Sequence, residues 1–448
     1  MDFDILPFIL VVVGSYFLVK LRFFFLLHPI RTAARAFRAI SDKRAASSFF
    51  LALAGTLGVG NVFGVALGLL IGGAGSLFWL LVSMLFAMVL KYAEVSLASD
   101  HLYHDTDTHG GFYYVIKGSL GRLAGPLSVL YSVILLALSL AMGAALQTVA
   151  IKETVLEIRP FPTLFLAITV TLLILVSIAG GTRKIERITV ILIPLTTIIY
   201  IFITLSIVTS NIGVLPEVIK HVISSAFNTE SVFGGGVGFL TSRALSEGFA
   251  RGLLSNEAGA GTSAMAHSRS GVLSPASAGL LGILEVYFDT GLICMLTGLS
   301  ILLSVGDISA FSGGMELVMY SVGNHLGEPG KIAVLFSVLS FAFATVICWY
   351  YYGSESWCSL FGRRSRALFL PVFLLAVFIG FYLDTYALVS LTDILMTAAT
   401  VLTLTALIKN SDRVKALSES GGVIDSDSGR LRPFRIKGSV FSKGEKRR

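Results

Sequence analysis

The chain has 448 residues, of which 55% are hydrophobic and only 14% are charged, and its formal net charge is +7. Soluble proteins carry about 25% charged residues, so this composition excludes a water-soluble enzyme, a disordered protein and a disulfide-rich secreted protein. Its apolar runs are long and unbroken, whereas the strands of a transmembrane β-barrel alternate in polarity. We therefore predict an all-α polytopic membrane protein.

Eleven apolar runs approach the roughly 20 residues that a helix needs to cross a bilayer. In chain order these runs cover residues 5–27, 48–73, 76–99, 124–150, 162–180, 186–210, 232–266, 276–305, 330–352, 366–383 and 386–408. Residues 1–47 hold the first of these helices and a basic loop. The polar residues 409–448 cannot bury a core, so we predict a flexible cytoplasmic tail there.

Lysine and arginine residues collect in every second loop. The first loop holds seven of them between Lys20 and Arg44, and the loops on the opposite side hold only Lys152, Arg159, Lys220 and Lys331. Because basic loops stay cytoplasmic, we expect the N-terminus outside and the C-terminus inside a bacterial plasma membrane. Clustered positive charge of this kind is typical of contact with the lipid bilayer, not of nucleic-acid binding. No obligate protein partner is evident.

Two apolar runs contain closely spaced glycines, which destabilise a helix by about 1 kcal/mol each relative to alanine. The second run contains Gly55, Gly58 and Gly60, and the seventh contains Gly259 and Gly261. Unwound backbone persists in lipid only where it lines a cavity in the protein. The two runs are five helices apart, so paired broken helices indicate an inverted-repeat transporter with its site near the midplane. We predict repeats over residues 48–231 and 232–408.

Two alternatives compete with this interpretation. Gly60, Gly64, Gly68 and Gly72 recur at every fourth position, a spacing that by itself lets a second helix approach closely. Gly58 and Asn61 lie off that face, so packing does not explain them. In the seventh run the break could instead lie at residues 234–238, which include four glycines.

Several short strings carry a family resemblance. In chain order they are GTLGVGNVFGV from Gly55, KYAE from Lys91, GGFYY from Gly110, GGT from Gly180, RGLLSNEAGAG from Arg251, Asp289-Thr290 and WYYYG from Trp349. This set resembles the alanine or glycine:cation symporter family, the sodium:alanine symporters. That family is similar to transporters of the LeuT-like fold, a five-plus-five inverted repeat with two discontinuous helices. One extra N-terminal helix then makes eleven transmembrane helices here.

The resemblance implies a secondary active symporter for a small neutral amino acid, of the alanine or glycine class, with sodium as the coupling ion. Proton coupling or a different small amino acid is the nearest alternative, because the chain departs from the family pattern. Val59 stands where threonine is usual, Phe63 replaces a small residue, and Ala260 stands where leucine is common. These changes lie near the breaks and could reshape the pocket.

An amino acid zwitterion needs hydrogen-bond donors for its carboxylate, acceptors for its ammonium group and a pocket for its side chain. Unwound backbone and half-helix N-termini offer free N–H groups, so we expect the first break to bind the carboxylate. Carbonyl groups of the second break would accept the ammonium. The resemblance implies that the Gln147 side chain joins them, because Gln147 stands where the family carries a substrate-contacting glutamine, and Trp349 would wall the pocket. Gln147 could instead form an interhelical hydrogen bond, and Trp349 could be a core aromatic. The predicted substrate-binding residues are Thr56, Gly58, Val59, Gly60, Asn61, Gln147, Leu254, Ser255, Asn256 and Trp349.

The resemblance also implies a sodium site. The carbonyls of Ala54 and Leu57 at the first break would bind the ion together with Phe341, Ala344 and Thr345. The last three share one helix face because their spacing is i, i+3 and i+4. Thr345 could instead hydrogen-bond only within its own helix. No organic cofactor is expected.

Charged residues inside apolar runs are functional candidates. Glu285 and Asp289 share one face of the eighth helix, and Arg243, Glu247 and Arg251 share one face of the seventh. We predict that the two faces pair as a gate, with helix packing as the alternative. Lys91 and Glu94 are expected to form a local pair.

No nucleophile elbow, HExxH motif or P-loop lysine occurs in the sequence, so no enzyme activity is predicted. The alternative functions are a passive channel and a sensor that binds without transporting. A channel would need rings of filter residues, and none is evident.

Overall fold

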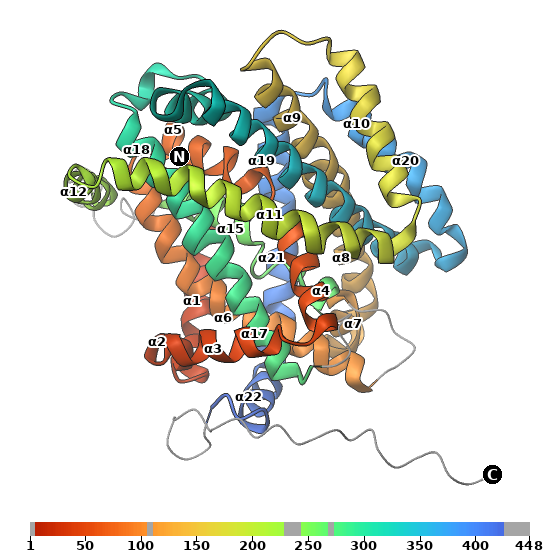
Figure 1. The fold of residues 1–448 in the computed structure, drawn as a ribbon. Helices are drawn as coiled ribbons and strands as arrows, with labels where there is room; N and C mark the ends of the chain where they lie inside the picture. The colour runs from red at the N-terminus through yellow and green to blue at the C-terminus, as the bar shows by residue number, and fades with distance from the viewer. Residues whose placement is uncertain (1–4, 105–110, 228–242, 268–272, 425–448) are drawn as a thin grey trace.

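The computed structural model describes residues 5–104, 111–227, 243–267 and 273–424, and these residues form helices and loops without a strand (Figure 1). Six helices are long and apolar enough to cross a membrane, and a seventh span results if one bent pair is counted as a single crossing. The predicted all-α polytopic membrane protein is thereby confirmed.

The helices of the first half are α1 Ile5–Lys20, α2 Phe24–Leu27, α3 Pro29–Ala39, α4 Lys43–Thr56, η1 Val59–Asn61, α5 Phe63–Gly72, α6 Gly75–His104, α7 Phe112–Ser119, α8 Ala124–Leu140, η3 Ala141–Leu146, α9 Gln147–Leu156, α10 Thr163–Ile178, α11 Gly181–Ser210 and α12 Leu215–Ala226. Those of the second half are α15 Arg243–Asn256, α16 Ala264–His267, α17 Pro275–Val286, η5 Tyr287–Cys294, α18 Met295–Ser304, α19 Gly314–Phe361, α20 Arg366–Gly380, α21 Thr385–Lys409 and α22 Ser411–Ser420.

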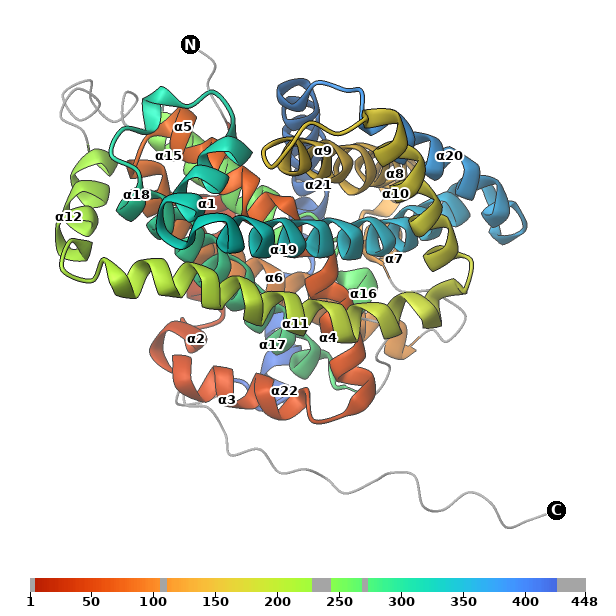
Figure 2. The same cartoon turned by 45° about the horizontal axis from the view of Figure 1, so that its top comes forward.

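The prediction that residues 5–27 form one helix is wrong. Helix α1 ends at Lys20, and Arg22 and Phe23 adopt positive φ angles of 57° and 52°. The chain then turns through α2 into α3, which lies across the lower end of the bundle (Figures 1 and 2). Helix α3 is basic and amphipathic, so its arginines stay outside the apolar layer.

The second run is interrupted as predicted. Helix α4 ends at Thr56, and α5 continues after a short 3-10 turn with its axis bent by 59°. Gly58 lies at the bend in an extended conformation (φ −105°, ψ −159°). We call residues 57–62 the first break.

The seventh run is also interrupted, but the interruption begins after Leu254 and Ser255, whose carbonyls were predicted to lie in it. Helix α15 continues to Asn256, and the backbone is non-helical from residue 257 to residue 263 before the single turn of α16. Leu254 and Ser255 therefore lie in the last turn of α15, not in unwound chain. We call residues 257–263 the second break. The alternative break at residues 234–238 lies outside the described part of the chain.

The stripe of small residues on α5 packs against α15, as the glycine spacing predicts. A Cβ atom added at Gly68 would lie 2.8 Å from Cγ of Arg251, and one added at Gly72 would lie 2.9 Å from Cβ of Glu247. The two interrupted segments are therefore in direct contact.

Three further irregularities shape the interior. The segments α8–α9 and α17–α18 each contain π-helical turns, η3 and η5, which often mark functional sites. Helix α19 is kinked at Gly327, where φ is +63°, two residues before Pro329. Beyond the kink, α19 runs beside α11 (Figure 2) and carries Thr345 and Trp349 into the core.

Part of the predicted flexible tail is folded, because residues 411–420 form α22 at the lower end of the bundle (Figure 1). Val414 is fully buried, Arg413 forms two bonds of 2.7 and 2.8 Å with the Asp100 carboxylate, and Ser418 accepts a hydrogen bond from the Tyr92 hydroxyl. These partners are more than 300 positions away in the sequence, so composition alone could not reveal them. Residues 425–448 lie outside the described part of the chain.

Replacing Gly248 by alanine is expected to lower the unfolding temperature of the purified protein clearly. A Cβ atom at this position would lie 2.5 Å from Cβ of Trp79 and 2.6 Å from the backbone oxygen of Ser76, where α15 crosses α6. Overpacking of this kind costs about 1–3 kcal/mol. The control is G213A, because a Cβ atom at Gly213 meets nothing within 4 Å. Equal melting temperatures for G248A and G213A would contradict this close packing of α15 on α6.

Candidate functional site

The carbonyl groups that end α4 face the side chains of α19. The Thr345 hydroxyl donates to the Ala54 carbonyl at 2.9 Å and lies 3.4 Å from the Leu57 carbonyl. The Trp349 indole donates to the Gly55 carbonyl at 3.3 Å. Phe341 and Ala344 are buried on the same helix within one turn of Thr345. The structure thus brings Ala54, Leu57 and Thr345 together, and Thr345 reaches across to another helix.

Gly58 lies between Thr345 and Gln147. A Cβ atom at Gly58 would be 2.9 Å from the Thr345 hydroxyl oxygen and 3.0 Å from Oε1 of Gln147. The backbone at this point does not need glycine for its φ angle, so the need for glycine comes from this close approach. The first break, α9 and α19 therefore meet at one point.

Gln147 binds the first break itself in this structure. Its Oε1 accepts the Val59 N–H at 3.2 Å, and its Nε2 donates to the Met142 carbonyl at 3.1 Å. The Val59 amide is therefore not free for a ligand here, in contrast to what the sequence predicts. The bond is possible because η3 ends directly before Gln147 and presents its side chain to the break.

A buried polar network joins the first break to the end of α15 and to η5. Nδ2 of Asn61 donates to Oδ1 of Asp289 at 2.5 Å and to the Ser255 hydroxyl at 3.0 Å. Ser255 and Thr290 also donate to the Asp289 carboxylate. Asn256 is linked to the same network, because its Nδ2 donates to the Thr290 hydroxyl at 3.0 Å.

Asp289 is fully buried, and no salt bridge reaches it from the described residues. Within the same network, Oδ1 of Asn61 is buried without a hydrogen-bond partner. A buried carboxylate without a cation is costly, and a lone carbonyl oxygen beside it adds to the negative potential. This combination attracts a positively charged group. The sequence carries the signal for this site, a carboxylate inside an apolar run, but the shared helix face of Glu285 and Asp289 suggests a gate instead.

The predicted gate between α15 and the eighth helix is wrong. Arg251 pairs with Asp393 at 2.5 Å and with Glu247 at 3.3 Å, and Glu285 pairs with Lys91 at 3.2 Å. The physical reason is that α6 packs against both α15 and α17 and supplies Lys91 between them.

The local pair of Lys91 and Glu94 is present at 3.9 Å. It belongs, however, to a larger buried cluster beside the second break. The sequence did not predict that cluster, because its members come from three separate segments.

The other predicted residues lie close by. Trp349 is fully buried and packs edge-on against Tyr352, with ring centroids 5.4 Å apart. The Leu254 carbonyl would lie 3.4 Å from a Cβ atom at Gly60, so the first break meets the end of α15 there. The Thr56 hydroxyl bonds only weakly within its own helix, at 3.4 Å to the Ala52 carbonyl. The first break and the end of α15 are thus adjacent.

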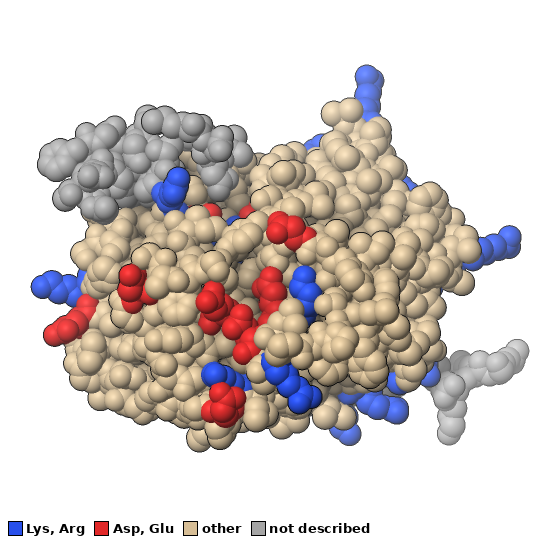
Figure 3. Space-filling model, turned by 90° about the horizontal axis from the view of Figure 1, so that it is seen from above, with Lys and Arg blue, Asp and Glu red and all other residues tan. Residues whose placement is uncertain are grey.

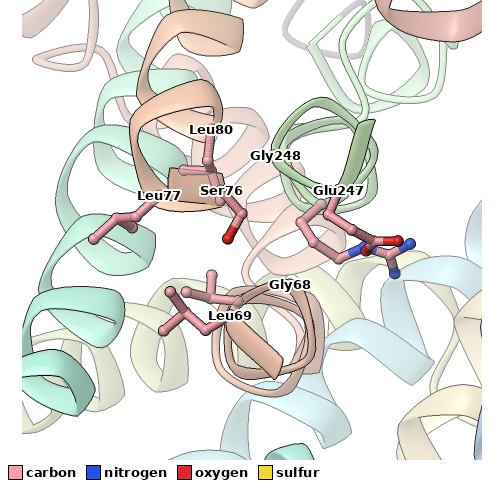
Figure 4. A pocket seen from close by; sticks show the side chains of 9 residues that line it. Gly68, Leu69, Ser76, Leu77, Leu80, Glu247 and Gly248 are labelled. Carbon is pink, nitrogen blue, oxygen red and sulfur yellow. The ribbon is translucent and has the colours of Figure 1, made fainter. Parts of the chain in front are cut away.

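The site is closed to solvent in this structure. The predicted substrate-binding residues are all buried, so a ligand could enter only after helices move. A crevice between α5, α6 and α15, lined by Gly68, Ser76 and Glu247 among others, lies elsewhere (Figure 4). It has no room for a water molecule, so we do not assign it a ligand.

Comparison with known proteins agrees with these features. A sequence model described as "Sodium:alanine symporter family" matches residues 2–419. The sodium/alanine symporter AgcS of Methanococcus maripaludis is 30% identical over 340 residues, which cover 73% of each chain. The amino-acid carrier protein AlsT of Bacillus subtilis is 29% identical over 357 residues, covering 78% of this chain and 74% of AlsT. An uncharacterized transporter of Haemophilus influenzae is 30% identical over 378 residues, covering 83% of this chain and 82% of that protein. The chain therefore belongs to the sodium:alanine symporter family, whose members are membrane transporters and not enzymes.

Proposed function

We propose that this protein takes up a small neutral amino acid, of the alanine or glycine class, together with sodium. The observation that carries the proposal is the meeting of the Ala54 and Leu57 carbonyls with the Thr345 hydroxyl at the first break. Membrane transporters bind coupling ions at such unwound carbonyls. The relative AgcS is named for the same pair of substrates, sodium and alanine.

In the proposed sodium site the Thr345 hydroxyl keeps its proton but turns it away from the Ala54 and Leu57 carbonyls, and the ion would lie between these carbonyl oxygens and the hydroxyl oxygen. Five oxygen ligands are then available, from Ala54, Leu57, Phe341, Ala344 and Thr345. Carbonyl and hydroxyl oxygens suit a hard monovalent cation, and the C-terminal end of α4 adds its partial negative charge. No carboxylate has to be desolvated for this.

In the proposed substrate site the carboxylate of the amino acid binds backbone amides between Gly58 and Asn61. Binding requires that Gln147 release the Val59 N–H, which it now holds at 3.2 Å. The freed Gln147 oxygen can then accept the substrate ammonium. The negative charge of Asp289 would attract the same ammonium group. The carbonyls of Leu254 and Ser255, at the end of α15, would be further acceptors for it. Trp349 limits the size of the side chain.

We further propose eleven membrane spans arranged as two inverted repeats, residues 48–231 and 232–408, preceded by one additional helix. The two breaks support this, because each interrupts the first helix of its repeat. We propose that the end of the bundle that carries the basic helix α3 and the helix α22 is cytoplasmic, with the C-terminus inside and the N-terminus outside; the arginines of α3 support this. Seen from the other end, most of the surface carries neither acidic nor basic side chains (Figure 3).

Transport then proceeds by alternating access. Sodium orders the first break, and the amino acid binds the ordered amides beside it. The helices that carry the two breaks tilt against the remaining helices and open the site to the other side. Since both ligands use the first break, each is expected to strengthen binding of the other.

The deciding experiment is uptake of radiolabelled alanine or glycine into proteoliposomes. An inward sodium gradient should drive accumulation above the outside concentration. Equilibration without accumulation would instead indicate a passive channel, and binding without flux would indicate a sensor. Accumulation driven by a proton gradient in the absence of sodium would show proton coupling. Competition by D- and L-amino acids then identifies the preferred substrate.

A further inference from the structure

A cluster of five ionisable side chains lies beside the second break and takes no part in the proposed sodium and substrate sites. The side chains come from α6, the second break, α16 and α17, and each is at most 1% exposed. They are Lys91, Glu94, Glu257, His267 and Glu285. The cluster contains three carboxylates, one lysine and one histidine, so its acidic groups outnumber its basic ones.

Lys91 is fully engaged by its neighbours. Its ammonium group donates to the Asn256 carbonyl and the Ser263 hydroxyl, both at 2.6 Å, and lies 3.2 Å from Oε1 of Glu285. Glu285 has further partners, because Ser263 donates to it at 2.8 Å and Nε2 of His267 lies 2.7 Å away. An ionised Glu285 is therefore compensated.

Glu94 is held by backbone groups of the second break. Its Oε2 accepts the N–H groups of Gly259 and Gly261 at 3.0 and 3.1 Å, and its Oε1 lies 3.9 Å from the Lys91 ammonium. Successive backbone N–H groups of this kind stabilise an anion. The Oε1 of Glu94, like that of Glu257, has no hydrogen-bond partner. The charge of Glu94 is nevertheless compensated, by the two N–H groups and by the Lys91 ammonium.

Glu257 is the member without compensation. Its Oε2 accepts the Thr262 hydroxyl at 2.5 Å, but its Oε1 is buried and has no hydrogen-bond partner. No salt bridge reaches this side chain from the residues that the structure describes. Its φ angle is +53°, a conformation that costs a residue other than glycine about 1–3 kcal/mol. Strain and an unpartnered oxygen thus coincide at one residue.

The charged and titratable groups around Glu257 do not give its carboxylate a positive partner. Electrostatic interactions connect it with Lys91, Glu285 and Asp289, and also with the uncharged side chains of Tyr131, Cys348 and Tyr352. Of these, only Lys91 is positive, and its hydrogen bonds go elsewhere. The imidazole of His267 faces Glu285. An ionised Glu257 would thus be a buried carboxylate without a partner, at a cost of several kcal/mol.

We propose that Glu257 binds a proton while the site is closed and releases it when the second break opens to water. Protonation forms an O–H bond at Oε1 with a proton from hydronium and leaves water, and release reverses the step. This proton site is separate from the sodium site at Thr345. This proposal rests on the proposed transport function only in its prediction for uptake, because the proton on Glu257 can be observed without transport.

Infrared difference spectroscopy of the purified full-length protein tests the proton directly. At neutral pH the wild-type protein should show the carbonyl band of a protonated carboxylic acid, and E257Q should lose the part of this band that Glu257 contributes, so that the difference spectrum between the two proteins contains it. The matched control is E153Q, since Glu153 also accepts a threonine hydroxyl, that of Thr385, but lies outside the cluster. E153Q should keep the band. If E257Q does not fold, E257G serves instead, because glycine adopts the positive φ angle without strain.

A protonated band of the same intensity in the wild-type protein, E257Q and E257G would overturn the proposal. So would a carboxylate band of Glu257 that shifts when sodium is added, since the occupant would then be sodium.

Uptake gives an independent measurement. As pH rises above neutrality, wild-type uptake should fall by up to about tenfold per pH unit as Glu257 loses its proton, whereas E257Q should show a flat profile. An unchanged pH profile in E257Q would also overturn the proposal. If no variant transports at all, the proposed function fails, and the infrared result still decides whether Glu257 holds a proton.

Discussion

Replacing Thr345 by valine is expected to raise the sodium concentration needed for half-maximal uptake by about 10- to 100-fold. Valine keeps the volume of threonine but removes the hydroxyl that now bonds the Ala54 carbonyl at 2.9 Å. One lost interaction with a charged group is worth about 1.5–3 kcal/mol, which corresponds to this range. The measurement is initial uptake of alanine or glycine by proteoliposomes over a series of sodium concentrations.

The matched control for this substitution is T392V. Thr392 is equally buried, but its hydroxyl donates to the Leu388 carbonyl of its own helix at 2.8 Å. We expect T392V to leave the sodium dependence unchanged. If T345V and T392V require the same sodium concentration, Thr345 does not bind the ion.

Replacing Gly58 by alanine is expected to reduce uptake by at least about 10-fold without unfolding the protein. The added methyl group would lie 2.9 Å from the Thr345 hydroxyl oxygen and 3.0 Å from Oε1 of Gln147. It would fill the space between the proposed sodium and substrate sites. Overpacking costs about 1–3 kcal/mol, of which 1.4 kcal/mol already corresponds to tenfold in affinity. Binding of labelled substrate and the melting temperature should be measured together.

G64A is the appropriate control for G58A. A Cβ atom at Gly64 would lie 3.5 Å from the Leu254 side chain, an ordinary contact, and Gly64 is helical. Uptake by G64A should therefore stay near the wild-type level. Normal uptake by G58A would show that substrate and ion do not approach each other at this residue.

The broken helices could be predicted from the sequence because their cause is local. Gly58 and Gly60 lower helix stability where they stand, and Gly58 lies off the packing face of its helix, so an interruption follows from spacing alone. The end of α15 was less predictable. Asn256 closes that helix and Glu257 adopts a positive φ angle without being glycine, and neither residue type signals such a turn strongly.

The proposed sodium ligands could not be predicted from local pattern. Thr345 and Ala54 are 291 positions apart, so only resemblance to a family brought them together. The structure now places them in contact, while the identity of the ion remains part of the proposal.

The charged interior was predicted least well. The sequence shows Glu285 as a charge inside an apolar run, which marks it as a functional candidate, and it suggests a local pair for Lys91, but it does not single out Glu257. Which of them pair depends on α6 passing between α15 and α17, a property of helix packing and not of spacing. The packing of α22 against Asp100 and Tyr92 could not be predicted either, because it too depends on contacts between distant helices.

The central claim is that sodium and a small amino acid bind next to each other at the first break. Its most direct test is calorimetric titration of the purified protein with alanine or glycine at low and saturating sodium, and with sodium at low and saturating amino acid. The account predicts that each ligand raises the affinity for the other, and by the same factor. Amino acid binding with an affinity that does not change with sodium would contradict it.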